Sequence, residues 1–540
     1  MKKYFAVFIF IMVFATKSLF AASQYAPQQS QLYVDFSILN LDGNIRQIAG
    51  KFMAPKAFNE EYSSFKTQMK AAIGVDLTSQ RSLFNVGLDN RRRSAFVLIN
   101  MDFMMPSFFF VAASTNSIKS SNFFIKMYKS STPDHKIRYV RHYNRVITII
   151  QKRVMSWDKE NQDPPKYKDD FAIVADGYYV VISNNVESVK LALQASRTGR
   201  NLARTRDFIL ATRAINQKVQ MFYMYMNGSL IDSLQKMASE FSKQKTTSKM
   251  IGLYKNIGMG IKVNGKEIVI DAKSQANPRH PYFRHAVKIY KPKPPKFDLF
   301  DYMPGQKPYA VMKASMDTRT YLNVFFPDTL PDIYKEFNRE MNQLSKSINF
   351  DLKTNVLDNL GNHYYLALYD YDASSQSGSR KFMKHLDFLG YAEVQNQAKL
   401  NKSINVLITQ AKKDIARRKS KRDKVLKEKI AGVPFHVITD GEISVYMGSY
   451  LGHFIMGTKK KRVSALIFNV ARRRKAFAYY NNILNRKLNY HFFLDFQTMV
   501  KNRKVPVELK GINWASLRYF HAYGNNWGTY FNFTLRLAFM

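Results

Sequence analysis

The alternation of apolar and polar positions is clearest in residues 171–195, where it predicts two strands, a tight turn and a helix. Two runs of β-branched and aromatic residues flank Asp176-Gly177, a dipeptide typical of two-residue hairpin turns. Asn184 is placed to cap the next helix, because apolar residues recur at helical spacing from Val186 to Leu193. We therefore expect a β-hairpin that packs against one amphipathic helix.

A second stretch, residues 435–468, repeats this arrangement around an Asp-Gly pair at 440–441. Thr458 is its expected helix cap, and the stretch has room for one additional strand. The same order of strands and helices recurs along the rest of the chain at an offset of about 275 residues. Among the corresponding elements are two helices with one apolar stripe each, expected over residues 58–73 and 331–348. The pattern predicts a tandem duplication.

The duplication predicts three segments after a leader: repeat domain 1 over residues 22–285, a Pro/Lys-rich linker over 286–300, and repeat domain 2 over 301–540. The linker is marked by Lys291–Lys296, a proline-rich run without apolar periodicity. Tight hairpins, rather than alternating strand–helix crossovers, predict an α+β fold. Each domain is expected to be a mainly antiparallel β-sheet with packed amphipathic helices.

The N-terminus predicts a signal peptide over residues 1–21. Met1-Lys2-Lys3 precedes the short apolar run Tyr4–Ala15, and Ala21 is a small residue at the expected cut. No later segment is long and apolar enough to cross a bilayer as a helix. We expect an exported protein, located in the periplasm, at the periphery of the outer membrane or outside the cell.

Two motifs carry a resemblance to a known family. Gly74–Leu77 and Asp176–Leu193 are similar to an uncharacterised bacterial family of exported proteins built on a duplicated domain of unknown function. The chain departs from that family in its basicity and in Gly441-Glu442-Ile443. The resemblance implies export and a two-copy α+β fold, and it transfers no catalytic residue.

Composition narrows the classes of partner and chemistry. The formal net charge of +43 favours polyanionic partners, such as lipopolysaccharide or anionic phospholipid. Nucleic acid is not expected, because the chain has no recognised binding motif for it. The absence of cysteine excludes disulfides, thiolate nucleophiles and Cys-ligated zinc.

Three basic runs in the second half of the chain are the candidate anionic-surface site. Their residues are Arg417, Arg418, Lys419, Lys421, Arg422, Lys459, Lys460, Lys461, Arg462, Arg472, Arg473 and Arg474. The first run belongs to Lys412–Lys429, which is expected to extend a helix that begins near Ala398 as an exposed arm. The second run falls in the first turn of a helix, where cations oppose the helix dipole. A solvated charged surface is the alternative interpretation.

No motif predicts a catalytic residue, a metal site or a cofactor. His280 and His285 are five positions apart with no glutamate between them, unlike a zinc-protease helix. Gly258-Met-Gly260 falls in an expected hairpin rather than at a strand-to-helix turn, so it does not predict a phosphate site. The acidic pairs at 169–170 and 370–372 are expected to be solvated turn residues.

The leading hypothesis is a non-enzymatic protein of the bacterial envelope, a two-domain binding or scaffolding module with affinity for anionic surfaces. One alternative is an enzyme of unknown class whose site forms at the interface of the two repeats. Another is an outer-membrane β-barrel, prompted by the alternating aromatic segment Tyr530–Phe539 but opposed by the long amphipathic helices. The sequence predicts no oligomeric state.

Overall fold

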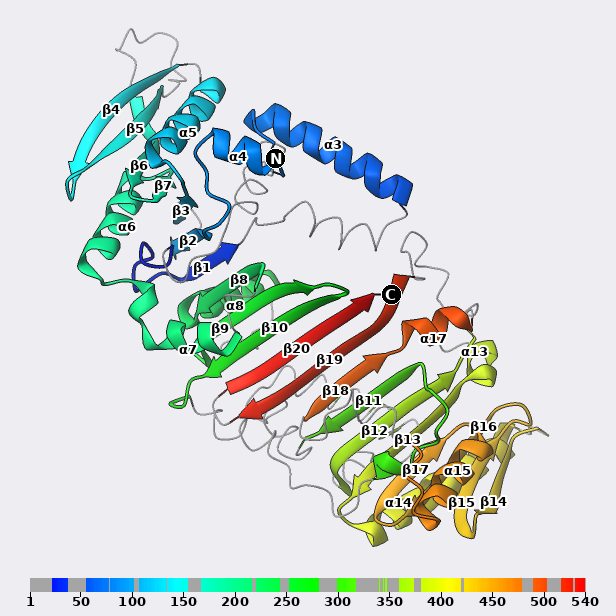
Figure 1. Cartoon of the computed structure of the whole chain (residues 1–540). Helices are drawn as coiled ribbons and strands as arrows, with labels where there is room; N and C mark the ends of the chain where they lie inside the picture. The colour runs from blue at the N-terminus through cyan, green and yellow to red at the C-terminus, as the bar shows by residue number, and fades with distance from the viewer. Residues whose placement is uncertain are drawn as a thin grey trace, which may run out of the picture. The chain divides into compact units, whose positions relative to one another are not determined.

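The computed structural model describes most of the chain (Figure 1). The described residues are 22–36, 55–76, 78–101, 106–132, 134–153, 167–215, 220–242, 252–280, 299–316, 339, 343, 345–346, 359–372, 380–418, 422–477, 489–502, 516–527 and 530–539. The predicted signal peptide, the linker Lys291–Lys296 and most of the helix predicted over residues 331–348 lie outside them.

The chain divides into two compact units. Unit 1 comprises residues 1–238 and 254–276, and unit 2 comprises residues 239–253 and 277–540. Each unit holds an antiparallel sheet with helices packed on it, so the predicted α+β class is confirmed.

Unit 1 contains the strands β1 (Leu32–Phe36), β2 (Ser94–Asn100), β3 (Ser107–Ala113), β4 (His135–His142), β5 (Arg145–Arg153), β6 (Tyr167–Asp176), β7 (Tyr179–Ser183), β8 (Phe222–Asn227), β9 (Tyr254–Asn264) and β10 (Glu267–Ala276). Their order within this unit is β4-β5-β6-β7-β3-β2-β1-β8-β9-β10, and every neighbouring pair is antiparallel. The described helices of the unit are α3 (Pro55–Ile73), α4 (Gln80–Asn85), α5 (Ser117–Ser131), α6 (Val186–Thr198), η1 (Leu202–Arg204), α7 (Arg206–Ile215) and α8 (Gly228–Ser242).

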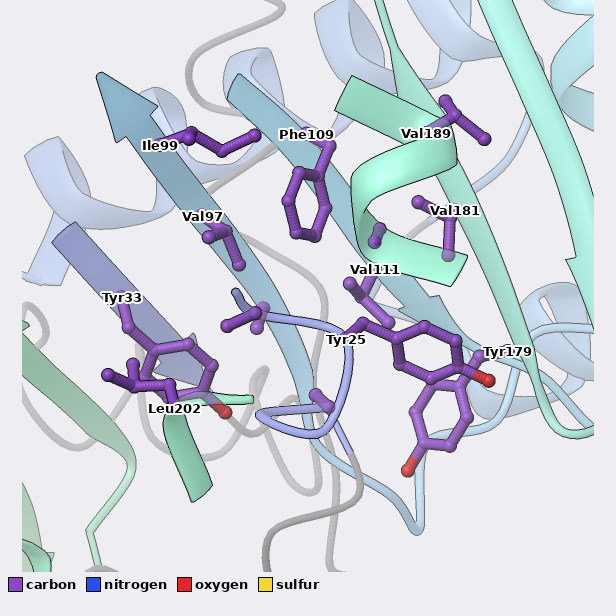
Figure 2. Packing of buried hydrophobic residues seen from close by; sticks show 14 of the residues in the cluster. Tyr25, Tyr33, Val97, Ile99, Phe109, Val111, Tyr179, Val181, Val189 and Leu202 are labelled. Atoms are coloured by element: carbon purple, nitrogen blue, oxygen red, sulfur yellow. The ribbon is translucent and has the colours of Figure 1, made fainter. Parts of the chain in front are cut away.

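Helices cover both faces of the unit 1 sheet. On one face, α6 packs against β3, β6 and β7 through Val189, which is fully buried (Figure 2). On the same face, α7 packs against β9 and β10, and its buried Phe208 contacts the rings of Tyr33 and Tyr223. The N-terminal segment joins this core, and the ring centroids of Tyr25 and Tyr179 lie 5.5 Å apart. On the other face, α5 packs against β6 and β7 through Phe124. The central strands β3 and β7 are largely buried because helices cover both of their faces.

The hairpin and helix predicted over residues 171–195 are confirmed as β6, β7 and α6. Gly177 has φ +60°, a left-handed conformation that glycine adopts without a Cβ penalty. The predicted cap is off by one residue, because the side chain of Asn185, not Asn184, accepts the hydrogen bond from the Glu187 amide. Asn184 precedes the cap, and the helix begins at Val186.

Unit 2 contains β11 (Ala310–Ser315), β12 (Leu360–Asp370), β13 (Asp387–Val394), β14 (Lys424–Ile430), β15 (Val433–Thr439), β16 (Ser444–Tyr450), β17 (His453–Gly457), β18 (Tyr490–Leu494), β19 (Leu517–Trp527) and β20 (Tyr530–Phe539). Their order within the unit is β14-β15-β16-β17-β13-β12-β11-β18-β19-β20, again antiparallel throughout. Its described helices are η4 (Leu299–Tyr302), α13 (Arg380–His385), α14 (Gln397–Arg418), α15 (Lys460–Ala471) and α17 (Phe496–Lys501).

Two helices position the candidate site in unit 2. Helix α15 packs on one sheet face through Val463 and Leu466, both fully buried. Helix α14 packs on the opposite face through Leu400, Ile404 and Ile408. Both helices contact β14, so this strand lies between them at the border of the sheet.

The predicted helical arm over Lys412–Lys429 is only half right. Helix α14 ends at Arg418, and Lys424–Ile430 is the strand β14. Ile430 is buried in the core, and Ala431-Gly432, both with positive φ, turns the chain into β15. Pairing with β15 and burial of Ile430 in the core stabilise the strand, although its polar composition resembles an exposed helix.

The hairpin predicted at Asp440-Gly441 is confirmed, because this pair joins β15 to β16, and Leu451-Gly452 makes the next turn before β17. Three further predictions in unit 2 are wrong. Thr458 does not cap α15, because its hydroxyl donates to the Leu386 carbonyl and accepts from the Phe388 amide. The strand predicted as additional is not an addition, because β4 and β5 precede β6 in unit 1 as β14 and β15 precede β16. The final hairpin also turns later than predicted, since residues 524–526 lie inside β19.

Candidate anionic-surface site

Strand β14 is an edge strand in the part of unit 2 that the structure describes. It pairs with β15 alone, and its three lysines, Lys424, Lys427 and Lys429, are all exposed. Edge strands commonly carry lysine, which discourages pairing with another chain. The cations thus have a structural explanation, and a site needs further evidence.

Alternation along β14 places its cations on both faces of the sheet. Val425 packs beneath α14, so Lys427 and Lys429 share the α14 face with it. Ile430 packs in the core beneath α15, so Lys424 lies on the α15 face. The edge therefore presents positive charge to both sides.

An ion pair brings the start of α15 to this strand. The ammonium of Lys460 lies 2.9 Å from the Glu428 carboxylate of β14, and this hydrogen bond raises the pKa of Lys460. Lys461 follows in the same helical turn and is exposed. The structure thus joins the second predicted basic run to the segment that contains the first.

On the α14 face, His436 lies beside two lysines. His436 lies directly opposite Lys427 in the β14–β15 register. Burial is the main cause of the lowered pKa of this imidazole, and the positive charges of Lys427 and Lys412 lower it further. An anion bound between the two lysines would relieve that unfavourable potential. We name the exposed cations Lys412, Lys424, Lys427, Lys429, Lys460 and Lys461 the basic edge.

Arg462 lies inside the protein, away from the basic edge. Its guanidinium is buried and donates to both carboxylate oxygens of Asp387, at 3.2 and 3.0 Å. The guanidinium carbon also lies 4.1 Å from the ring centroid of Tyr369. Since the pair is inaccessible, Arg462 cannot bind a surface, although it stands in the run that predicted the site.

The third predicted run forms a separate cluster. Arg472, Arg473 and Arg474 are exposed just beyond the C-terminal end of α15. A helix of 12 residues is about 18 Å long, which separates them from Lys460. Cations at the C-terminal end of a helix are stabilised by the helix dipole. The guanidinium carbon of Arg472 also lies 3.9 Å from the ring centroid of Phe468.

The first predicted run is only partly described. Arg417 is exposed near the end of α14, and Arg422 is exposed before β14. Lys419, Lys421 and the side chain of Arg418 lie outside the described residues. The site prediction omitted Lys412, Lys424, Lys427 and Lys429, and the Ala-Gly turn that follows KVLKEKI was the sequence signal for a strand there.

A family model described as "Protein of unknown function (DUF3352)" matches residues 6–424. The chain belongs to this family. The DUF3352 match ends at the first residue of β14, so most of the basic edge follows the matched region. A search of curated proteins found no match.

Among solved structures, this DUF3352 protein is similar to two entitled "Structure of crystal form IV of TP0453" and "Structure of crystal form I of TP0453". The match to the first has 6% sequence identity and a TM-score of 0.25, and it covers 47% of this chain and 80% of the matched chain. The second shares 7% identity and the same TM-score, over 48% and 81%. At this TM-score the likeness supports no conclusion.

Unit 2 of the DUF3352 protein also places a buried serine and a buried histidine beside a half-buried carboxylate. The hydroxyl of Ser315 lies 2.9 Å from Nδ1 of His363, whose Nε2 lies 4.0 Å from a carboxylate oxygen of Glu393. Cross-strand neighbours at the end of the sheet bring the three together. No sequence pattern predicted this arrangement, because the three residues are far apart along the chain.

Other predicted positions have structural roles. A Cβ at Gly260 of β9 would lie 2.6 Å from Ile215, so close packing against α7 explains this glycine. Asp169 lies in β6 rather than in a turn, and its hydrogen bond from Arg138 is the main cause of its lowered pKa. Within the described ranges, no group of three His, Asp or Glu side chains could hold a metal ion. None of the helices searched there is long and apolar enough to cross a membrane.

Proposed function

We propose that this protein is a non-enzymatic, exported protein of the bacterial envelope that binds anionic surfaces through the basic edge of unit 2. The chemistry of the bound group is phosphate, carried by lipopolysaccharide or by anionic phospholipid. The location follows from the predicted signal peptide and includes the periplasm, the outer-membrane periphery and the exterior.

The observation that carries the proposal is the positive field around β14. Six exposed lysines come from three elements, and the Glu428 carboxylate pairs with one of them. The lowered pKa of His436 supports a field that extends to a neutral neighbour. Cations near an anionic membrane contribute about 1 kcal/mol each to binding.

Sedimentation with lipopolysaccharide, and separately with phosphatidylglycerol vesicles, tests the proposal over a series of salt concentrations. Binding should be strong at low salt and weaken steeply as salt rises, because salt screens exposed charges. A protein that stays in the supernatant with both probes at low salt contradicts the proposal.

Charge reversal tests the location of the site. The variant Lys424→Glu/Lys427→Glu/Lys429→Glu should bind roughly a hundredfold more weakly, from about 1 kcal/mol per cation. A matched control, Arg472→Glu/Arg473→Glu/Arg474→Glu, makes the same charge change beyond the other end of α15. Equal losses in both variants would mean that net charge, not the basic edge, determines binding.

We also propose that units 1 and 2 are tandem homologous domains. Support comes from the strand order: when strands are numbered within each unit, both units follow 4-5-6-7-3-2-1-8-9-10. An experimental structure should therefore superpose β4 on β14 and β10 on β20 when the units are aligned. A structure in which residues 424–430 continue α14 would remove the counterpart of β4.

A second candidate function is enzymatic, favoured by Ser315, His363 and Glu393. A serine beside a histidine that faces a carboxylate is the arrangement of a nucleophile with its general base. Labelling of the intact protein with a fluorophosphonate, with Ser315→Ala as control, tests this alternative. Labelling that disappears in the variant would favour an enzyme, and no labelling is expected if the Ser315–His363 bond is a buried structural contact.

A further inference from the structure

The hairpin β4–β5 of unit 1 (Figure 1, cyan) exposes large apolar side chains. Tyr139 is 67% exposed, Val146 is 48% exposed, and Tyr143 in the turn is 43% exposed. Single exposed apolar residues are ordinary on soluble proteins, but a cluster on one element marks an interaction surface.

The register of the hairpin places these side chains together. Arg141 pairs with Val146, and Tyr139 pairs with Thr148, so all four residues share one face. Ile147 and Ile149, which alternate with them, are fully buried against the core. The hairpin therefore has one face inside the unit and an outer face that combines tyrosine, valine and arginine.

The turn of the hairpin holds an aromatic residue in an unusual conformation. Tyr143 and Asn144 have φ values of +46° and +57°, the left-handed pair that a two-residue turn requires. Asparagine and glycine are the common residues there, whereas a bulky residue at positive φ is an outlier. A tyrosine at this strained position, 43% exposed at the tip, points to a role outside the fold.

The charge of the hairpin is wholly positive. Residues 135–153 contain no Asp or Glu, and their cations are Lys136, Arg138, Arg141, Arg145, Lys152 and Arg153. Three of these arginines bind carboxylates from elsewhere in unit 1: Arg138 binds Asp169, Arg145 binds Asp176, and Arg153 binds Asp134. Lys136, Arg141 and Lys152 are exposed, and no described carboxylate lies within ion-pair distance of them.

We infer that the β4–β5 hairpin is a membrane-interface anchor that inserts Tyr139, Tyr143 and Val146 among the headgroups of an anionic bilayer. Tyrosine prefers the boundary between hydrocarbon and water, because its ring is apolar and its hydroxyl is polar. Lysine and arginine beside it bind anionic lipid phosphates. The inference rests on the proposed function and names a phospholipid bilayer as its surface.

Protection of an edge strand explains only part of the pattern. In the described part of unit 1, β4 pairs with β5 alone, so its cations would discourage strand pairing as on any edge. That role needs no tyrosine at the tip and no exposed valine on β5. The exposed apolar residues distinguish an anchor from a protected edge. The variants described next therefore change these apolar residues and leave the cations in place.

Because the chain has no cysteine, a single label can be placed at the tip. The variant Tyr143→Cys carries an environment-sensitive fluorophore, and Gln194→Cys, exposed on α6, is the matched control in the same unit. Each is mixed with vesicles of equimolar phosphatidylcholine and phosphatidylglycerol. The label at 143 should shift to shorter wavelength and be quenched by lipids spin-labelled near the headgroup, while the label at 194 should not change.

Removal of the apolar side chains gives a second measurement. The full-length variant Tyr139→Ser/Tyr143→Ser/Val146→Ser should bind these vesicles at least roughly tenfold more weakly. Its urea midpoint and its sedimentation with lipopolysaccharide should match the wild type, because the three side chains are exposed and the basic edge is intact. An unchanged vesicle affinity would overturn the anchor.

The outcomes separate this inference from the proposed function. If the protein binds vesicles while the label at 143 stays in water, the anchor is wrong and the basic edge stands. If the label inserts and the Lys424→Glu/Lys427→Glu/Lys429→Glu variant binds normally, the anchor stands and the basic edge is wrong. If neither vesicles nor lipopolysaccharide bind at low salt, both are wrong.

Discussion

The hydroxyl of Tyr25 donates a hydrogen bond of 3.1 Å to the carboxylate of Asp176, across 151 positions of the chain. The same buried carboxylate accepts from Arg145 of β5 at 2.7 Å and from Arg197 of α6. Asp176 ends β6 at the Asp-Gly turn. A residue that the sequence marked as a turn former thus joins the N-terminal segment, a strand and a helix.

Replacement of Asp176 by alanine should lower the free energy of unfolding by about 3 kcal/mol. The change leaves the Tyr25 hydroxyl buried without its acceptor and removes the partner of two arginines. Urea unfolding, followed by circular dichroism, measures the loss. Asp134→Ala is the control, since its pair with Arg153 is exposed on both sides and should contribute less than about 0.5 kcal/mol.

Arg462→Met should destabilise unit 2 by about 3 to 5 kcal/mol, because it leaves Asp387 buried without its partner. The double variant Arg462→Met/Asp387→Leu should recover most of that loss, since neither charge remains buried. Lys461→Glu, one residue earlier and exposed, should leave stability unchanged and weaken binding to lipopolysaccharide. An Arg462→Met protein of normal stability would contradict the buried ion pair.

Stability should fall in acid because of His521 in β19. Burial, with the charges of His491 and Arg536, lowers the pKa of His521 to about 3. The unfolded chain, with a histidine pKa of about 6.5, therefore binds the proton first as the pH falls. The stabilisation is complete above pH 6.5 and is lost between 6.5 and about 3, by an amount on the order of 5 kcal/mol.

The measurement is the free energy of unfolding in urea as a function of pH. His521→Gln should have a shallower loss between pH 6.5 and 4 than the wild type. His385→Gln, at an exposed position of α13, should retain the wild-type slope. Equal slopes in all three proteins would exclude His521 as the source.

Occupation of the basic edge should raise the pKa of His436 toward its ordinary value. A phosphate between Lys412 and Lys427 would offset the two charges that, after burial, hold this pKa down. An NMR titration of the ring protons with and without phosphatidylglycerol micelles measures the change. Lys412→Ala/Lys427→Ala should also raise the pKa without lipid, and a lipid-independent pKa in the wild type would place the phosphate elsewhere.

Local turn chemistry explains which elements were predictable. The Asp-Gly turn at Asp176 and the Asn-Gly turn at Asn264 each lie between strands with strong apolar alternation, and both hairpins form. The helix α3 was equally visible, because its apolar stripe continues over several turns. In these segments local preference and the tertiary environment agree.

The edge strands β4 and β14 were missed or assigned to a helix, since their sequences are dominated by charge. In His135–His142 most side chains are polar, and the pairing that makes it a strand comes from β5. The burial of Arg462 was equally unpredictable, because its partner Asp387 lies 75 positions away in the sequence. Nothing in the local sequence distinguishes Arg462 from the neighbouring exposed lysines. Burial of one cation within a basic run is decided by tertiary contacts that no local pattern contains.

The lysines of β14 also affect the association of two molecules of this protein through this edge strand. Neighbouring strands in a sheet lie about 4.8 Å apart, so two β14 edges that approached each other would bring like charges into contact. In solution this repulsion opposes strand-to-strand dimerisation. Anions that neutralise Lys424, Lys427 and Lys429 remove the repulsion, so adsorption to an anionic surface and self-association at this edge are thermodynamically linked.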